Sequence, residues 1–134
     1  EGHLIADELL EDNARTIVGP VISERCKPEL RNHTIETAGI LNKAGVPMCI
    51  CTDHPVVPEQ YLPLSAGLAV RGGLDRNEAL KAITIYPAQI TGIADRVGSI
   101  EVGKDADIVI FSGDPLSVCD TPDMVIVNGT VIQS

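Results

Sequence analysis

The chain has 134 residues, of which 44% are hydrophobic, and a formal net charge of −9 at pH 7. This size and composition are typical of one modest globular domain and argue against intrinsic disorder. The acidic balance, without any run of Lys or Arg, argues against partners such as nucleic acid or an anionic membrane, because both need clustered basic side chains. No apolar run approaches the length of a transmembrane helix.

Helical and strand-like patterns alternate in the first half of the chain. Residues 4–12 place apolar side chains on one face of a helix, with acidic ones on the other. The runs at residues 15–22 and 47–52 are typical of short buried strands, and residues 34–44 between them predict a helix. Strand, loop, helix and strand with short joints is the βαβ pattern of a parallel sheet. We therefore expect an α/β fold.

Local signals mark the ends of the helix predicted over residues 34–44. Asn32 or Thr34 can serve as its N-cap, and Gly45 follows its last residue. Glycine at that place favours the left-handed backbone that ends many helices. The sequence thus predicts a helix with defined limits between the two strands.

Two further helices are predicted in the middle of the chain, over residues 62–73 and 75–93. Asp75 stands at the N-cap position of the second, and Glu78 stands three residues later, as in a capping box. From about residue 97, short β runs are broken by glycines, and Asn128-Gly129 is a strong signal for a hairpin turn. We expect a boundary near residue 96, with residues 1–96 and 97–134 as separate parts.

The chain contains four cysteines, Cys26, Cys49, Cys51 and Cys119. A chain this rich in other core residues does not need a disulfide framework. The spacing Cys49-x-Cys51 also differs from the C-x-x-C spacing of a zinc knuckle. The cysteines are therefore interpreted as reduced thiols, and the expected location is cytoplasmic.

Asp53 ends the second strand run and is the first candidate for a functional residue. Strand alternation would place it on one face with Cys49 and Cys51, at the carboxyl end of a parallel strand. Ligands and catalytic groups lie at that end in α/β barrels and open α/β sheets. The alternative is that Asp53 only binds backbone N–H groups in the turn before Pro55. The residues alone leave both interpretations open.

The three histidines lack the spacing of a known metal motif. His54 lies next to Asp53 and is either a loop residue or a contact to substrate. His33 is expected at the surface near a helix start, and His3 at the start of the first helix, where a ligand role is possible. The polar loop with Ser23, Glu24, Arg25 and Lys27 is more simply a solvated loop than a substrate contact.

Three stretches follow one another in order: CICTDHP at residues 49–55, LAVRGGLDRNEALKAITIYPAQITGI at 68–93, and GSIEVGKDADIVIFSGDP at 98–115. Together they resemble the C-terminal part of the metal-dependent amidohydrolase superfamily, in the branch of imidazolonepropionase and related amidohydrolases. The likeness extends over nearly the whole chain. Asp53 matches the aspartate that ends the eighth barrel strand of that family.

Further blocks of the family pattern can be matched residue by residue. The matches to T-x-N-P-A-x-x-L-G, to G-x-I-x-x-G-x-x-A-D-x-V and to the closing V-x-V-N-G are Thr84, Pro87, Ala88, Gly92, Gly98, Ile100, Gly103, Ala106, Asp107, Val109, Val127, Asn128 and Gly129. The chain departs at Tyr86, where the family usually has Asn, and at Ile90-Thr91. Asp107 lies away from the strand end of Asp53 and is expected to fix a turn.

The resemblance implies the last two strands and helices of a TIM-type (β/α)8 barrel over residues 1–96, followed by strands of a small β-sandwich over 97–134. It implies one or two divalent metal ions, usually zinc, and hydrolysis of a C–N bond in a small-molecule substrate. Asp53 would bind metal, take a proton from water and pass it to the leaving nitrogen, and His54 would contact substrate.

The family's H-x-H, its strand-four ligand and its strand-five and strand-six histidines have no match in this chain. Two strands cannot close an eight-stranded barrel. We therefore expect the chain alone to be inactive, and to self-associate or to need the missing N-terminal part of the same protein. A rival hypothesis is a non-catalytic α/β domain that binds small ligands or subunits, with Asp53 as a turn residue. A third is that the longer protein has the fold but has lost its metal site.

Overall fold

The computed structural model describes residues 1–133. Its elements in chain order are η1 (Gly2–Ile5), α1 (Ala6–Glu11), β1 (Thr16–Val18), η2 (Pro28–Leu30), α2 (Thr37–Ala44), β2 (Met48–Ile50), η3 (Glu59–Tyr61), α3 (Leu62–Arg71), α4 (Arg76–Ala82), α5 (Ile85–Thr91), β3 (Ile108–Ile110), β4 (Met124–Val127) and β5 (Thr130–Gln133). The fold is α/β, as predicted.

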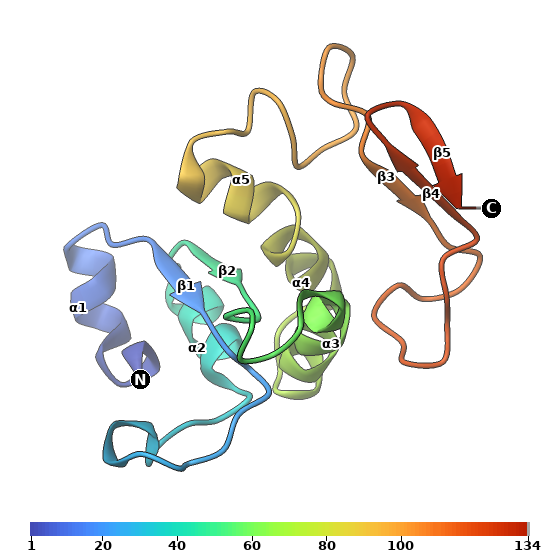
Figure 1. Ribbon diagram of the computed structural model, residues 1–134. Coiled ribbons are helices and arrows are strands. Elements are labelled where there is room, and N and C mark those ends of the chain that lie inside the picture. Colours follow the sequence, from blue (N-terminus) through green and yellow to red (C-terminus); the bar gives the residue numbers. More distant parts are fainter. Residues whose placement is uncertain (134) are drawn as a thin grey trace.

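Strands β1 and β2 pair in parallel, with Thr16 opposite Met48 and Val18 opposite Ile50. Helix α2 connects them, so the predicted βαβ unit is confirmed (Figure 1). Both strands are shorter than predicted, and β1 gives way to Gly19-Pro20 directly after Val18. Within the described residues each strand has one neighbour, which leaves one edge of each strand free.

The core forms around β2, whose three residues are all buried. Helices α2, α3, α4 and α5 all contact this strand. The largest fully buried apolar side chain is Leu41 of α2, which is 1% exposed. Helices α3 and α4 contact each other, and both contribute fully buried small side chains, which are Ala66, Ala69, Ala79 and Ala82. Small residues let two helix backbones approach closely, so this core needs few aromatic rings.

The first two predicted helices differ from the structure in their details. The first is split into η1 and α1, and Leu4 and Ile5, expected on its apolar face, are exposed. The second, α2, starts at Thr37 and not at residue 34, so neither Asn32 nor Thr34 is its N-cap. The prediction for its other end is confirmed, because Gly45 has a left-handed φ of 81°.

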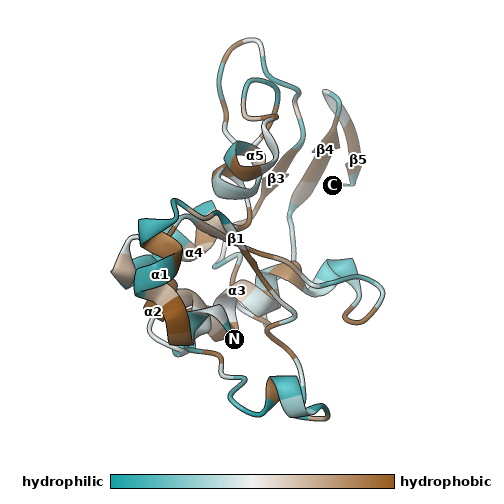
Figure 2. Cartoon of the chain, turned by 90° about the vertical axis from the view of Figure 1, so that its left-hand side faces the viewer, coloured by the Kyte–Doolittle hydropathy of each residue, from teal (hydrophilic) through white to brown (hydrophobic). Residues whose placement is uncertain are grey.

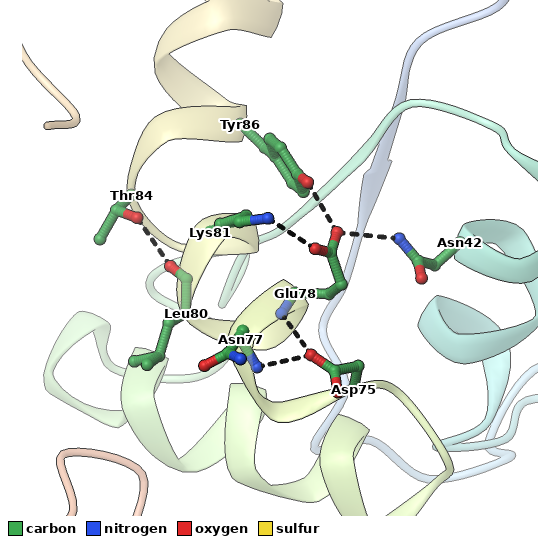
Figure 3. A network of polar contacts seen from close by, with 8 residues as sticks. All are labelled: Asn42, Asp75, Asn77, Glu78, Leu80, Lys81, Thr84 and Tyr86. Atoms are coloured by element: carbon green, nitrogen blue, oxygen red, sulfur yellow. Dashed lines mark hydrogen bonds and ion pairs between the residues drawn. The ribbon is translucent and has the colours of Figure 1, made fainter.

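The helix predicted over residues 75–93 is two helices, α4 and α5. Pro87 explains the break, because its ring would clash with the carbonyl of Ile83 in a continuous helix. Asp75 is the N-cap, as predicted, and accepts from two backbone N–H groups. Only half of the predicted capping box forms: the Glu78 N–H donates to Asp75, whereas the Glu78 carboxylate accepts from Lys81, Tyr86 and the Asn42 amide of α2 (Figure 3).

The C-terminal part is a three-stranded antiparallel sheet in the order β3-β4-β5. Asn128 and Gly129 both have positive φ, which confirms the predicted hairpin turn. The Asp107 carboxylate accepts from the Asn128 N–H at 2.8 Å, so it fixes this turn as expected. The strands are apolar along most of their length (Figure 2), yet Val131 and Ile132 are 52% and 63% exposed.

The loop between β3 and β4 returns to the helices. Leu116 from this loop is buried in the core cluster, and its carbonyl lies against Gly67 of α3. Arg76 at the start of α4 pairs with Asp114 at 2.6 Å, which lowers the pKa of the Asp114 carboxyl mainly through that hydrogen bond. The sheet is thus attached to the helices by this loop as well as by the connection after α5. Within residues 1–133, no helix combines the length and apolar character needed to cross a membrane.

The burial of Leu41 allows a direct test of where the core lies. Leu41→Ala should lower the free energy of unfolding by about 2–5 kcal/mol, because it removes buried methyl groups and leaves a cavity beside β2. Leu4→Ala is the matched control, because Leu4 is 58% exposed, and it should change stability by about 0.5 kcal/mol or less. Chemical denaturation measures both, and similar losses would contradict this description of the core.

Candidate active site

Asp53 lies just beyond the carboxyl end of β2. The Cys51 N–H donates to the Val18 carbonyl at 2.9 Å, so the pairing of the two strands continues one residue past β2. Thr52 is buried, and the chain then turns at Asp53, which is exposed and has a φ of 55°. The structure therefore puts this residue at the end of the parallel strands where the sequence predicted it.

The strand alternation that was expected to include Asp53 stops before it. Met48, Cys49 and Ile50 are all buried, so both faces of β2 are covered. The positive φ of Asp53 takes that residue out of the extended strand. Asp53 therefore does not share a strand face with Cys49 and Cys51, and its side chain begins in the turn, where solvent and ligands have access.

The structure does not give the Asp53 side chain a role in the turn. The turn is closed by the Asp53 backbone carbonyl, which accepts from the Val56 N–H at 2.8 Å. Within residues 1–133, the Asp53 carboxylate makes no hydrogen bond and no ion pair. The alternative from the sequence required this carboxylate to bind backbone N–H groups. An exposed carboxylate without a local partner is available to a ligand.

Gly19 holds the end of β1 close to the end of β2. A methyl group added at Gly19 would overlap the Cys51 carbonyl oxygen and would come within 2.6 Å of the Cys51 Sγ. The carbonyl is backbone, so only a shift of one strand end could make room. The absence of a side chain at Gly19 therefore sets the distance between the strand ends next to Asp53.

The three histidines lie in different surroundings. His54 is exposed in the turn beside Asp53. His33 is partly exposed and precedes α2, and its Nε2 lies 3.2 Å from the Pro20 carbonyl oxygen. Because a carbonyl can only accept, His33 Nε2 carries the proton in this bond. His3 Nδ1 lies 3.1 Å from the Thr37 hydroxyl of α2.

The structure brings His3 and His33 together but leaves Asp53 apart from them. Both histidines line a cavity of about 310 Å³ alongside β1, which neither Asp53 nor His54 lines. In the loop after β1, the Arg25 guanidinium donates twice to the His33 carbonyl, at 3.0 and 3.1 Å. That pairing closes the loop on itself, and Glu24 and Lys27 in it are exposed.

A complete metal site is not present in residues 1–133, where no three His, Cys, Asp or Glu side chains are grouped to hold an ion. The four cysteines are free. Burial, with a smaller contribution from Cys51, raises the pKa of the Cys49 thiol, which disfavours the thiolate that a metal would bind. The Asp53 carboxylate is of a type that can bind zinc, but it could supply only one ligand. Structural zinc needs four protein ligands and catalytic zinc three.

Sequence reasoning missed a second cavity of about 470 Å³ at the opposite end of β2. Arg15, Asn42, Tyr86 and Gln89 supply its polar side chains. They come from three separate parts of the chain, since Tyr86 and Gln89 share α5, so no short motif could have joined them. The only signal in the sequence was Tyr86, which stands where the family pattern usually has Asn.

Gly19→Ala should lower the free energy of unfolding by about 1–3 kcal/mol, because the added methyl group cannot avoid the Cys51 backbone. Gly2→Ala is the control, since a methyl group there meets only the movable end of the Leu9 side chain, at 3.2 Å. Chemical denaturation compares the two variants. Equal stability of Gly19→Ala and the unchanged protein would show that the strand ends are not held this closely.

Comparisons with known proteins show the family to which the chain is related. The sequence model of the Amidohydrolase family matches residues 4–132. An imidazolonepropionase from Geobacillus kaustophilus is 46% identical over 72 residues, which are 52% of this chain and 17% of that protein. Across the curated relatives, the chain spans between 11% and 21% of their length.

The solved structures include close and distant relatives. An amidohydrolase from Thermotoga maritima is 38% identical, with a TM-score of 0.93 over 98% of this chain and 34% of that one. An adenosine deaminase from Xanthomonas campestris with bound zinc is 23% identical, with a TM-score of 0.60 over 97% of this chain and 34% of its own, and shows a shared fold alone. With the family matched from residue 4 to residue 132, the chain belongs to the amidohydrolase family.

Proposed function

We propose that this chain is the C-terminal part of a metal-dependent amidohydrolase that hydrolyses a C–N bond in a small amide or cyclic amide. The observation that carries the proposal is the Asp53 carboxylate, exposed at the carboxyl end of a parallel strand pair and without a partner in residues 1–133. Relatives that are amidohydrolases supply the reaction class.

The two parallel strands are proposed to be the last two of a (β/α)8 barrel, of which residues 1–96 form only the C-terminal part. Each has one neighbour in the described chain, whereas every strand of a closed barrel has two. The apolar side chain of Ile17 in β1 is 59% exposed, which also supports a further neighbour for this strand. Residues 97–134 are proposed to be strands of a small β-sandwich, because the exposed Val131 and Ile132 need a second layer to cover them.

The proposed chemistry gives Asp53 two tasks. A bound divalent metal ion, in the family usually zinc, lowers the pKa of water and polarises the carbonyl group of the substrate. One oxygen of the Asp53 carboxylate would bind that ion, and the other would accept the proton of the attacking water. The same carboxyl group then donates this proton to the leaving nitrogen. His54, exposed in the same turn, is placed to contact substrate.

The remaining metal ligands are proposed to come from another part of the same, longer protein. This proposal is supported by the small share of its relatives that the chain spans and by the single carboxylate at its strand end. That part would also cover the free edge of β1. Free cysteines, one of them fully within the core, are compatible with a reducing, cytoplasmic location.

In the longer protein, Asp53→Asn should reduce turnover by about 10²–10⁴-fold, because the amide can neither accept the proton of water nor carry it to nitrogen. Asp95→Asn is the control, since Asp95 is exposed and stands far along the chain from the strand ends. Steady-state kinetics with amide substrates measures the change. An unaffected rate for Asp53→Asn would favour the rival hypothesis of a non-catalytic binding domain.

The 134-residue chain by itself should show no hydrolysis, because Asp53 cannot form a zinc site without further ligands. Purified chain would be incubated with one equivalent of zinc and assayed for amide hydrolysis, with bound metal measured after dialysis. Turnover together with stoichiometric zinc would overturn the proposal that the other ligands lie elsewhere.

A further inference from the structure

One cavity lies at the end of the sheet opposite to Asp53. It has a volume of about 470 Å³ and is bordered by Pro47 and Met48, where β2 begins, whereas Asp53 follows the end of that strand. This volume lies in the range of pockets that hold small organic ligands. A ligand in this cavity would not compete with a substrate at Asp53.

A positive charge without a counterion borders this cavity. Within residues 1–133, the Arg15 guanidinium is in no ion pair, and its one hydrogen bond, to the Gln89 carbonyl, is long at 3.4 Å. A guanidinium carries five N–H donors, so most of those on Arg15 are free for a ligand. Other basic side chains in residues 1–133 also lack an ion pair, and Arg15 differs from them because it borders this cavity.

The carboxylate of Glu78, whose partners Tyr86 and Asn42 border this cavity, already accepts several hydrogen bonds. Glu78 accepts from Lys81 at 2.8 Å, from the Tyr86 hydroxyl at 2.6 Å and from the Asn42 amide at 3.3 Å (Figure 3). Lys81 first and Tyr86 second lower the pKa of Glu78, so it stays ionised and bound to these groups. The network fixes Tyr86 and Asn42 at the cavity wall, and Glu78 is not free to neutralise Arg15.

The remaining lining is apolar. Val46, Met48 and Ile90 border the cavity together with the Tyr86 side chain. Tyr86 stands where the family pattern usually has Asn, so the cavity takes part of its shape from a residue that departs from this pattern. One cation and an apolar wall complement a ligand with one negative group and an apolar body.

We propose that this cavity binds a small carboxylic acid, whose carboxylate pairs with Arg15 and whose apolar body lies against Val46, Met48 and Ile90. A carboxylate matches the planar, forked donors of a guanidinium and can accept two of them side by side. Asn42 and Gln89 border the same space and offer further polar contacts. This site is separate from the proposed function at Asp53.

The test uses benzoate as the probe and benzamide, its neutral isostere, as the comparison. Titrations followed by NMR should show that benzoate binds about tenfold or more tightly than benzamide, because only benzoate forms a charged pair with Arg15. Arg15→Gln should weaken benzoate binding by about tenfold or more. Arg71→Gln is the matched control, because Arg71 is also an exposed arginine but does not border the cavity.

Three results would overturn the proposal: no binding of benzoate at millimolar concentration, equal binding of benzoate and benzamide, or unchanged binding to Arg15→Gln. Asp53→Asn should leave benzoate binding unchanged, which separates this site from the proposed active site. A loss of binding in Asp53→Asn but not in Arg15→Gln would place the benzoate at Asp53 and would also contradict the proposal.

Discussion

The burial of β2 on both faces is the constraint on which the rest of the structure depends. All three of its residues are inaccessible, with β1 beside it and four helices in contact. A strand buried on both faces must be apolar throughout, so it cannot itself carry polar functional groups. Polar side chains are therefore found beyond its two ends: Asp53 follows the strand, and the cavity bordered by Arg15 lies at its start.

Close backbone contacts at two glycines hold β1 against the end of β2 and the loop between β3 and β4 against α3. Gly19 allows the end of β1 to meet Cys51, and Gly67 allows the loop of Leu116 to lie on α3. In both cases a side chain would meet backbone and not a flexible group. A core of alanines and short aliphatic residues leaves little unfilled space to absorb such a shift.

The sequence predicted the parts of this structure that depend on near neighbours. The βαβ order, the cap by Asp75, the helix end at Gly45 and the Asn128-Gly129 turn all follow from local patterns, and all are present. Asp53 was placed at the correct strand end because the strand before it was recognised. The role of its carboxylate stays a prediction.

What the sequence could not predict depends on contacts between distant residues. The side chain of Glu78 could bond to the backbone of the helix start, as in a capping box, or to side chains elsewhere. It accepts from Asn42 and Tyr86 because the fold brings these two residues close to it. The break between α4 and α5 was readable from Pro87 but was outweighed by the helical pattern around it. The cavity of Arg15 joins three segments that are far apart in the sequence, which no local spacing reveals.

Leu116 has a consequence for how the chain can be divided. The sequence changes character near residue 96, yet a residue twenty positions later fills the core among the helices. A boundary along the chain is therefore not a boundary through the interior. A protein shortened at residue 96 would lose one of its own core side chains, and the helices would be left with a hole where that leucine had been.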